Sequence, residues 1–267
     1  MKSVVITGST RGIGRGLAEQ FLARGCRVMV SGRSQQAVDA VVEQLAQQAG
    51  AENVAGKACE IADAGQLQAL WDAAVERFGK VDVWINNAGV SLPRKPLAET
   101  DPAHIEQVIQ VNLTGLLLAN RVALRGMGAQ GGGQIWNMEG FGSGGQVQPG
   151  MSVYGASKRA VNYLNKALQK ELDDSGVQVC TLSPGIVVTD LLIGDYDTNS
   201  PEWQKSKKIF NILGDTVETV TPFLVDGILK TDKSGGKVAW LTGGKAFMRF
   251  MTAGFNKRDL FAHLEQA

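Results

Sequence analysis

The chain has 267 residues, 44% of them hydrophobic, and a formal net charge of +1. This composition is typical of a globular protein with a sizeable core, and the near-zero charge argues against a nucleic-acid-binding protein. No apolar run reaches the length of a membrane span and the three cysteines lack metal-ligand spacing, so we expect no transmembrane segment and no metal site.

Strand and helix patterns alternate along the whole chain. The strand patterns cover 3–7, 27–31, 53–58, 81–85, 133–138, 177–182 and 237–241. The helical patterns cover 12–24, 34–49, 64–78, 101–127 and 153–174. Such alternation predicts an α/β protein with one parallel sheet. Because no long linker or repeat interrupts the patterns, we expect residues 1–267 to form a single domain.

The first strand runs directly into a glycine-rich turn that opens a helix. The turn reads Gly8-Ser9-Thr10-Arg11-Gly12-Ile13-Gly14. Glycines let a backbone approach phosphate groups closely, and a helix N-terminus offers free N–H groups and a positive dipole end. The spacing is G-x-x-x-G-x-G rather than the G-x-G-x-x-G of the standard dinucleotide fingerprint. The arrangement predicts a cradle for a dinucleotide pyrophosphate, with a purely structural loop as the alternative.

The end of the second strand indicates which dinucleotide would bind. It reads Ser31-Gly32-Arg33-Ser34 and contains no carboxylate. An NAD-selective site usually has Asp or Glu here to bind the ribose 2′-hydroxyl. Arg33 instead offers a guanidinium that can pair with a 2′-phosphate, and Arg11 adds a second positive charge. We therefore predict NADP(H); the alternative is that both arginines are solvated loop residues.

A tyrosine and a lysine four residues apart indicate proton chemistry. Tyr154 and Lys158 lie in the last of the predicted helices, where positions i and i+4 share a face. A free tyrosine ionises near pH 10, and a neighbouring ammonium lowers that pKa. The pair predicts a proton donor for a carbonyl oxygen, and the alternative is a surface pair on an ordinary helix.

Five motifs in chain order resemble the short-chain dehydrogenase/reductase family. They are Thr7-Gly8-x-x-x-Gly12-Ile13-Gly14, Asn86-Asn87-Ala88-Gly89, Asn112 in Val111-Asn112-Leu113, Tyr154-x-x-x-Lys158 and Ser183-Pro184-Gly185. Together they cover most of residues 3–190. The resemblance implies a Rossmann-type doubly wound parallel sheet with helices on both faces, and a homodimer or homotetramer.

The resemblance also implies roles for individual residues. Tyr154 would be the acid/base, Lys158 would lower its pKa and hold the nicotinamide ribose, and Asn112 would support a water connected to the lysine. The cofactor-binding residues that it implies, beside Tyr154 and Lys158, are Gly8, Ser9, Thr10, Arg11, Gly12, Ile13, Gly14, Arg33, Glu60, Ile61, Asn87, Ala88, Gly89, Pro184, Gly185, Val187 and Thr189.

The serine that this family uses to bind the substrate oxygen is displaced. Its usual position falls on Gly140 or Phe141, and the nearest hydroxyl is that of Ser143, in a glycine-rich loop. We predict that Ser143 takes the role from a shifted position, the alternative being a site that works without serine. Glu139 is a further candidate for the site, or else a solvated carboxylate at a strand end.

The irregular loop resembles one branch of the family. Asn137-Met138-Glu139-Gly140-Phe141-Gly142-Ser143 is similar to the Asn-Met-Asp-Gly-x-Gly-Ser segment of chlorophyll b reductases. The resemblance implies NADPH-dependent reduction of a chlorin formyl group to hydroxymethyl, a step of chlorophyll catabolism. Two alternatives stay open: an NADP-dependent dehydrogenase or reductase of small ketones, alcohols or sugars, and a non-enzymatic nicotinamide-binding sensor or scaffold.

Two C-terminal segments complete the predictions. Residues 191–216 are apolar and aromatic, and we expect them to cover a small-molecule carbonyl substrate, with packing onto the core as the alternative. Residues 245–267 form an apolar extension for which we expect contact with a second subunit or with substrate rather than with a membrane surface. The sequence starts in a strand pattern without a signal peptide, which predicts a cytoplasmic protein.

Overall fold

The computed structural model describes residues 1–172, 175–194 and 196–262. Within them the centre is a seven-stranded sheet of order β3-β2-β1-β4-β5-β6-β7, in which every neighbouring pair is parallel. The strands are β1 (Ser3–Ile6), β2 (Arg27–Gly32), β3 (Val54–Ala58), β4 (Val83–Asn86), β5 (Gly133–Met138), β6 (Val177–Ser183) and β7 (Lys237–Ala239). The predicted doubly wound sheet is confirmed. Strand order reverses between β1 and β4, where such folds open a crevice at the carboxyl ends of the strands.

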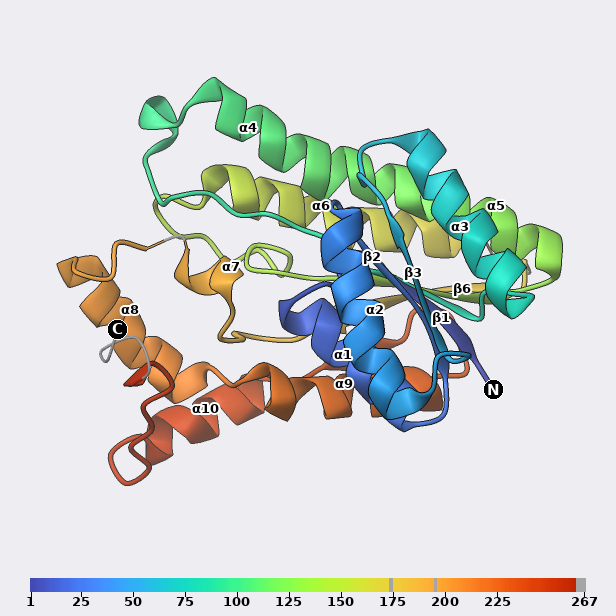
Figure 1. The fold of residues 1–267 in the computed structure, drawn as a ribbon. Coiled ribbons are helices and arrows are strands. Elements are labelled where there is room, and N and C mark those ends of the chain that lie inside the picture. The colour runs from blue at the N-terminus through green and yellow to red at the C-terminus, as the bar shows by residue number, and fades with distance from the viewer. Residues whose placement is uncertain (173–174, 195, 263–267) are drawn as a thin grey trace.

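Helices cover both faces of this sheet (Figure 1). One face carries α1 (Gly12–Ala23), α2 (Gln35–Ala49) and α9 (Val217–Lys230). The other carries α3 (Ala64–Phe78), α4 (Pro102–Ile109), α5 (Leu116–Gln130) and α6 (Ser152–Glu171). Two hydrophobic cores result, one on each face, which is why the strands read as nearly continuous apolar runs.

Alternation along the first strand shows how the two cores are separated. Val4 and Ile6 pack with the α1, α2 and α9 side, whereas Val5 packs with the α3 and α5 side. All three side chains are at most 1% exposed. Successive side chains of a strand point to opposite faces, so a strand buried on both faces must be apolar at every position.

The predicted helix 101–127 is divided in the structure. The π-helical turn η2 (Gln110–Gly115) separates α4 from α5. A π turn is wider than an α turn, and it occurs often at functional sites. The apolar periodicity of the sequence does not reveal one wide turn, because the helix continues with the same face inward on both sides of it.

Residues beyond the sheet form a smaller lobe. The predicted covering segment 191–216 contains the end of α7 (Asp190–Ile193) and α8 (Pro201–Leu213), and the predicted extension contains most of α10 (Gly243–Thr252). A third apolar cluster joins them, because Trp203 and Phe210 of α8 pack with Phe261 near the C-terminus, which is fully buried. The lobe lies to one side of the sheet, with α8 and α10 adjacent (Figure 1). Residues 263–267 of the predicted extension lie outside the described residues.

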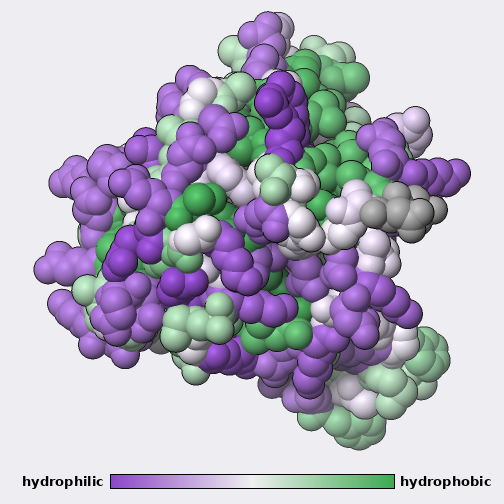
Figure 2. All heavy atoms as spheres, turned by 90° about the vertical axis from the view of Figure 1, so that its right-hand side faces the viewer, coloured by the Kyte–Doolittle hydropathy of each residue, from purple (hydrophilic) through white to green (hydrophobic). Residues whose placement is uncertain are grey.

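The surface of the molecule is mixed in character. On the face shown in Figure 2, polar and charged side chains surround smaller apolar areas. Throughout the described ranges, every helix is too short or too polar to cross a membrane.

Candidate active site

Lys158 and Tyr154 meet on one face of α6, as their spacing predicts. The Lys158 Nζ atom lies 5.8 Å from the centre of the Tyr154 ring. Lys158 is only 6% exposed. Burial disfavours its ammonium form and lowers the pKa of Lys158 to about 8. An amine with this pKa changes charge near neutral pH, where a proton relay has to work.

Asn112 lies in the π-helical turn and is held by the loop that follows β4. Its Nδ2 donates to the Val90 carbonyl (2.8 Å), and its Oδ1 accepts from the Val90 N–H (2.9 Å). A Cβ atom placed on Gly89 would lie 3.4 Å from Asn112 Oδ1 and 3.5 Å from Lys158 Nζ. Asn112 and Lys158 therefore converge on Gly89, at the carboxyl end of β4.

Ser157 joins this corner and was not singled out from the sequence. It accepts a hydrogen bond from Asn112 Nδ2 (3.2 Å) and donates to the Tyr154 carbonyl (2.7 Å). It is 1% exposed. Ser157 thus ties the π-helical turn to the first turn of α6. Its position next to Lys158 was the only feature of the sequence that could have indicated Ser157 as a site residue, because a serine inside a helix has no motif of its own.

The glycine-rich loop after β5 approaches Tyr154 through Gly140. A Cβ atom on Gly140 would lie 2.5 Å from Tyr154 Oη and 3.2 Å from Lys158 Cε. A side chain at position 140 would require the Tyr154 hydroxyl to shift. Gly140 is one of the two positions where the resemblance expects the family serine, and its backbone lies beside the tyrosine hydroxyl.

Ser143 holds this loop onto α6. Its hydroxyl donates to the Lys158 carbonyl (3.0 Å) and accepts from the Gly140 N–H (3.1 Å). Its backbone carbonyl accepts from Arg159 Nη1 (2.9 Å), and the residue is 1% exposed. The direct role expected for Ser143 stays a prediction, and it would require the hydroxyl to leave these two partners.

Glu139 is buried and paired, and its candidacy for the site stays a prediction. Its carboxylate pairs with Lys237 of β7, with Lys237 Nζ 2.7 Å from Glu139 Oε2. The Glu139 side chain is 7% exposed, so it is not a solvated carboxylate. Lys237 lies on β7, the edge strand beyond β6, so the sequence around β5 alone could not identify it as the partner of Glu139.

A groove of about 220 Å³ runs along the carboxyl ends of the central strands. Its walls include thirteen of the predicted cofactor residues, namely Gly8, Thr10, Arg11, Gly12, Ile13, Gly14, Arg33, Glu60, Ile61, Asn87, Ala88, Gly89 and Thr189. It is also lined by residues outside the predicted cofactor set, namely Gly32, Cys59, Val90, Val111, Asp190 and Leu191. The structure thus gathers segments from six parts of the chain around one cavity.

Close backbone approach explains the glycines of the turn. Gly8 has φ of +63°, and a Cβ there would lie 2.9 Å from Ala88 Cα. A Cβ on Gly14 would collide with the Gly8 carbonyl oxygen. Asn87 fixes the turn by donating from Nδ2 to the Gly8 carbonyl (2.8 Å). Thr7, which the sequence did not single out as a site residue, accepts from the N–H groups of Asn87 and Ala88 at 3.1 Å each.

Two polar residues of the turn have partners within the protein. Ser9 is fully buried; its hydroxyl donates to the Ile6 carbonyl (2.7 Å) and accepts from the Ser31 N–H (2.9 Å). Arg11 pairs with Asp190 at 3.2 Å, with both side chains about three-quarters exposed. Such an exposed pair contributes little to stability and leaves Arg11 able to exchange partners.

The segment after β6 lies across the groove from the glycine turn. Pro184 is buried, and Gly185 has φ of +75° with no room for a Cβ, which would lie 2.6 Å from Leu241. Val187 is buried and pairs with Asp215 in a parallel bridge. Thr189 follows, with its Cγ2 3.5 Å from the position of a Cβ on Gly12. Of the four predicted residues in this segment, Thr189 lines the groove, whereas Pro184, Gly185 and Val187 are not among its lining residues.

Residues 2–199 match the family model described as short chain dehydrogenase. The chain belongs to the short-chain dehydrogenase/reductase family. It is accordingly an oxidoreductase, and the expectation of a non-enzymatic sensor is set aside. The match covers the glycine turn, the Asn112 and Tyr154–Lys158 corner and the segment after β6.

Relatives of the chain include two kinds of chlorophyll(ide) b reductase. Chlorophyll(ide) b reductase NOL of Oryza sativa is 38% identical over 259 residues, which are 94% of this chain and 74% of the relative. Probable chlorophyll(ide) b reductase NYC1 of Arabidopsis thaliana is 35% identical over 94% of this chain, which spans only 53% of that relative. These relatives are named chloroplastic proteins, as are their counterparts in the other plant. The cytoplasmic location expected from the sequence is therefore contradicted by these relatives.

A solved structure shares the fold and contains a nicotinamide cofactor. The 7α-hydroxysteroid dehydrogenase complexed with NADH and 7-oxo glycochenodeoxycholic acid is 27% identical, with a TM-score of 0.76 over 91% of this chain and 93% of its own. A nicotinamide cofactor is thus supported for this chain as a member of the family.

Proposed function

We propose that this chain is an NADPH-dependent reductase of a chlorin formyl group, a chlorophyll(ide) b reductase acting in chlorophyll catabolism. The observation that carries the proposal is the extent of the match. Identity to chlorophyll(ide) b reductases reaches 35–38% over 94% of the chain, whereas a 3α-hydroxysteroid dehydrogenase of Mediterraneibacter gnavus matches 72% of it at 34%.

The groove residues fit a dinucleotide because glycine backbone, rather than side chains, lines the groove at the turn before α1. Gly8 and Gly14 leave no space for a Cβ, so the first turn of α1 can present its N–H groups to a pyrophosphate. Gly89 and Thr189 would border the nicotinamide half, where Lys158 Nζ is close to Gly89. When bound, the reduced nicotinamide supplies a hydride to the formyl carbon.

The chain itself supplies the proton. Tyr154 Oη donates it to the formyl oxygen, which becomes the hydroxyl of the hydroxymethyl product. Lys158 holds its amine beside the phenol, and Asn112 fixes the loop of Gly89 and Val90 that lies next to Lys158 Nζ. Ser143 holds Gly140 against Tyr154, so it positions the acid through the loop.

Apolar side chains beside this corner suit a large flat ring. Phe141 follows Gly140 and is 36% exposed, and Leu191 borders the groove and is 42% exposed. The helices that follow Leu191 are the proposed cover of the substrate. Large exposed apolar residues next to a proton donor are typical of a site for an apolar ligand.

Selectivity for NADPH rests on Arg33. It lines the groove at the end of β2, directly after Gly32, and residues 31–34 contain no carboxylate. Arg11 is close enough to the groove to add positive charge when it leaves Asp190. A charge-assisted hydrogen bond of this kind contributes roughly 1.5–3 kcal/mol.

The decisive experiment follows NADPH oxidation with a panel of substrates. The panel contains chlorophyll b, its free acid, a formyl pheophorbide, small aldehydes and ketones, and a 3-oxosteroid. Reduction of the formyl chlorins with hydroxymethyl products supports the proposal. Turnover confined to small carbonyls or the steroid refutes it and favours the second candidate, a reductase of smaller substrates. Light scattering of the same sample tests the proposed homodimer or homotetramer.

A further inference from the structure

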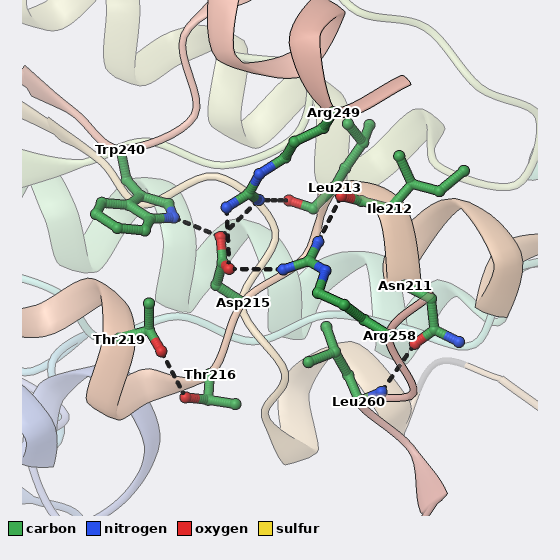
Figure 3. Close-up of polar contacts among 10 residues, drawn as sticks. All are labelled: Asn211, Ile212, Leu213, Asp215, Thr216, Thr219, Trp240, Arg249, Arg258 and Leu260. Atoms are coloured by element: carbon green, nitrogen blue, oxygen red, sulfur yellow. Dashed lines mark hydrogen bonds and ion pairs between the residues drawn. The ribbon is translucent and has the colours of Figure 1, made fainter. Parts of the chain in front are cut away.

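Two arginines of the C-terminal lobe show how this protein stabilises a largely buried guanidinium (Figure 3). Arg249 donates two hydrogen bonds to the Asp215 carboxylate, from Nη1 to Oδ2 (2.7 Å) and from Nη2 to Oδ1 (3.1 Å). Arg249 Nη1 also donates to the Leu213 carbonyl (2.9 Å), and Arg258 Nη1 donates to Asp215 Oδ1 (3.0 Å). Such acceptors are needed because a buried cation without partners is costly.

Arg94, in the loop after β4, lacks acceptors for part of its guanidinium. Its Nε and Nη1 atoms are buried, and neither has a hydrogen-bond partner among the residues that the structure describes. The guanidinium lies over the ring of Tyr196 instead, with Arg94 Cζ 4.2 Å from the ring centre. Stacking of this kind uses the face of the guanidinium and leaves its N–H groups, which lie in the plane, open. Because nearly all buried polar groups in proteins are paired, the unpaired donors of Arg94 indicate an acceptor that comes with a ligand.

A second arginine with an unpaired buried atom, within the described part of the chain, has a different setting. It is Arg27, whose Nε is unpaired but whose Nη2 donates to Ser3 Oγ (2.9 Å). Arg27 and Ser3 begin β2 and β1, so this arginine lies at the amino ends of the strands. The cofactor groove lies at the carboxyl ends, where the loop after β4 also begins. Arg94 is therefore the arginine of the two that lies on the side of the candidate active site.

Arg94 contacts both the approach to α6 and the segment proposed to cover the substrate. A Cβ atom on Gly150, two residues before α6 begins, would lie 3.1 Å from Arg94 Cβ. The stacking partner Tyr196 packs with Trp203 and Phe210 of α8, at 5.3 Å and 5.7 Å between ring centres. Arg94 as a whole is partly exposed, so it lies at the boundary between these two parts rather than in a sealed core.

The chain neighbours of Arg94 reach Tyr154. Pro93 and Lys95 line a hollow of about 10 Å³ together with Tyr154. A hollow of this size holds about one water molecule, so the loop and the proposed acid are close together. A substrate whose carbonyl oxygen reaches Tyr154 Oη therefore lies beside the loop that carries Arg94.

The acceptor for Arg94 is expected on the substrate rather than on the cofactor. Arg94 is not among the residues that line the cofactor groove, whereas Arg11 and Arg33 are. The pyrophosphate is expected at the glycine turn before α1. Residues 90–98 contain Arg94 and Lys95 but no Asp or Glu, so an anionic group of the substrate would meet only positive charge in this loop. A planar guanidinium matches the geometry of a carboxylate.

We propose that Arg94 binds a carboxylate of the substrate, which makes it a specificity-determining residue. The chlorin substrate is then the free acid, whose carboxylate is attached to a large apolar ring, rather than the uncharged ester; this choice rests on the proposed function. Because protein atoms cover Nε and Nη1, entry of the carboxylate requires Tyr196 and the segment that carries it to move away from Arg94. The substrate carboxylate then supplies the acceptor that the guanidinium lacks.

Fluorescence titration of the full-length protein with two chlorins measures binding without turnover. The ligands are a formyl pheophorbide with a free carboxylate and the same compound with that carboxylate converted to a methyl ester. The wild type should bind the acid roughly tenfold or more tightly, because only the acid can form charge-assisted hydrogen bonds with Arg94. Arg94→Gln should lose this preference by weakening the acid and leaving the ester unchanged. Arg94→Lys, which keeps the charge without the planar donors, should keep part of the preference.

A matched control removes the same charge elsewhere. Arg77→Gln changes an exposed arginine in the last turn of α3, which leads to the amino end of β4, and it should keep the wild-type preference. NADPH titration checks that each variant is folded, because Arg94 does not line the cofactor groove and its loss should leave cofactor affinity unchanged. Equal binding of acid and ester by the wild type, or the full preference in Arg94→Gln, overturns the proposal.

NADPH oxidation with both chlorins separates this inference from the proposed function. Reduction of both chlorins without any preference in binding rejects the role of Arg94 alone. Preferential binding of the acid without reduction of its formyl group supports the role of Arg94 and rejects the formyl reductase alone.

Discussion

Burial of the Lys158 amine should lower the free energy of unfolding, and a neutral side chain at this position should raise it again. The pKa of Lys158 falls from 10.5 to about 8 on folding because burial disfavours its charge. Each pH unit of such a shift corresponds to about 1.4 kcal/mol, so charge burial costs roughly 3 kcal/mol at neutral pH. Lys158→Met keeps the aliphatic stem and removes the charge. We expect it to unfold at a higher denaturant concentration than the wild type near neutral pH.

The pH dependence separates this effect from ordinary repacking. Below pH 8 both the folded and the unfolded chain carry the proton on Lys158, so folding bears the whole cost. Between about pH 8 and 10.5 the unfolded chain binds more protons than the folded one, so wild-type stability rises with pH. The advantage of Lys158→Met should therefore shrink across this window.

Urea unfolding without cofactor, followed by fluorescence at about pH 7 and about pH 10, measures both values. The matched control is Lys166→Met, which changes an exposed lysine of the same helix and should alter stability by no more than about 0.5 kcal/mol at either pH. An advantage of Lys158→Met that is equal at both pH values, or a loss of stability at neutral pH, would refute the reasoning. Turnover should be lost in either case if Lys158 has the proposed role.

Four further substitutions test individual parts of the site. Tyr154→Phe should lower turnover by roughly 10²–10⁴-fold with unchanged NADPH affinity, measured by cofactor titration, and a near-normal rate would remove Tyr154 from its role. Arg33→Ala should weaken NADPH by about tenfold or more and leave NADH unaffected, and equal losses for both cofactors would contradict selectivity. Gly140→Ser places a serine at one of the two positions expected for the family serine, but it should lower turnover by roughly 10²-fold because the new side chain would meet Tyr154 Oη; full activity would show that the loop can move to admit it. Ser143→Ala should lower the free energy of unfolding by about 1–3 kcal/mol, because the Gly140 N–H loses its partner, and a stable but inactive protein would instead favour a direct catalytic role.

The alternation of strands and helices, and the glycine turn between the first strand and the first helix, could be predicted from the sequence. Val4, Val5 and Ile6 precede the glycine turn, and this combination of a buried strand, close backbone approach and a helix start is local along the chain. The spacing of Tyr154 and Lys158 is local as well, because one helical turn fixes it. Such features depend on residues within a few positions of one another, so the sequence alone determines them.

Contacts between distant segments were decided only by the tertiary structure. Gly140 meets Tyr154, Glu139 pairs with Lys237, and Ser157 receives a hydrogen bond from Asn112. Each of these contacts joins segments on different elements, and their distance depends on how the sheet and helices pack. The sequence supplied a serine at 143 near the right place, but only packing shows that its hydroxyl is turned toward α6.

The C-terminal lobe shows the same division most clearly. The residues from Phe247 to Phe255 are visibly apolar in the sequence, and an apolar helix alone predicts a buried side. Asp215 reverses that expectation, because a carboxylate buried 34 residues before Arg249 turns the cation inward and the apolar side outward. Hydrophobic pattern along the sequence determines that a helix forms, whereas the buried charges it meets in the fold determine which way it faces.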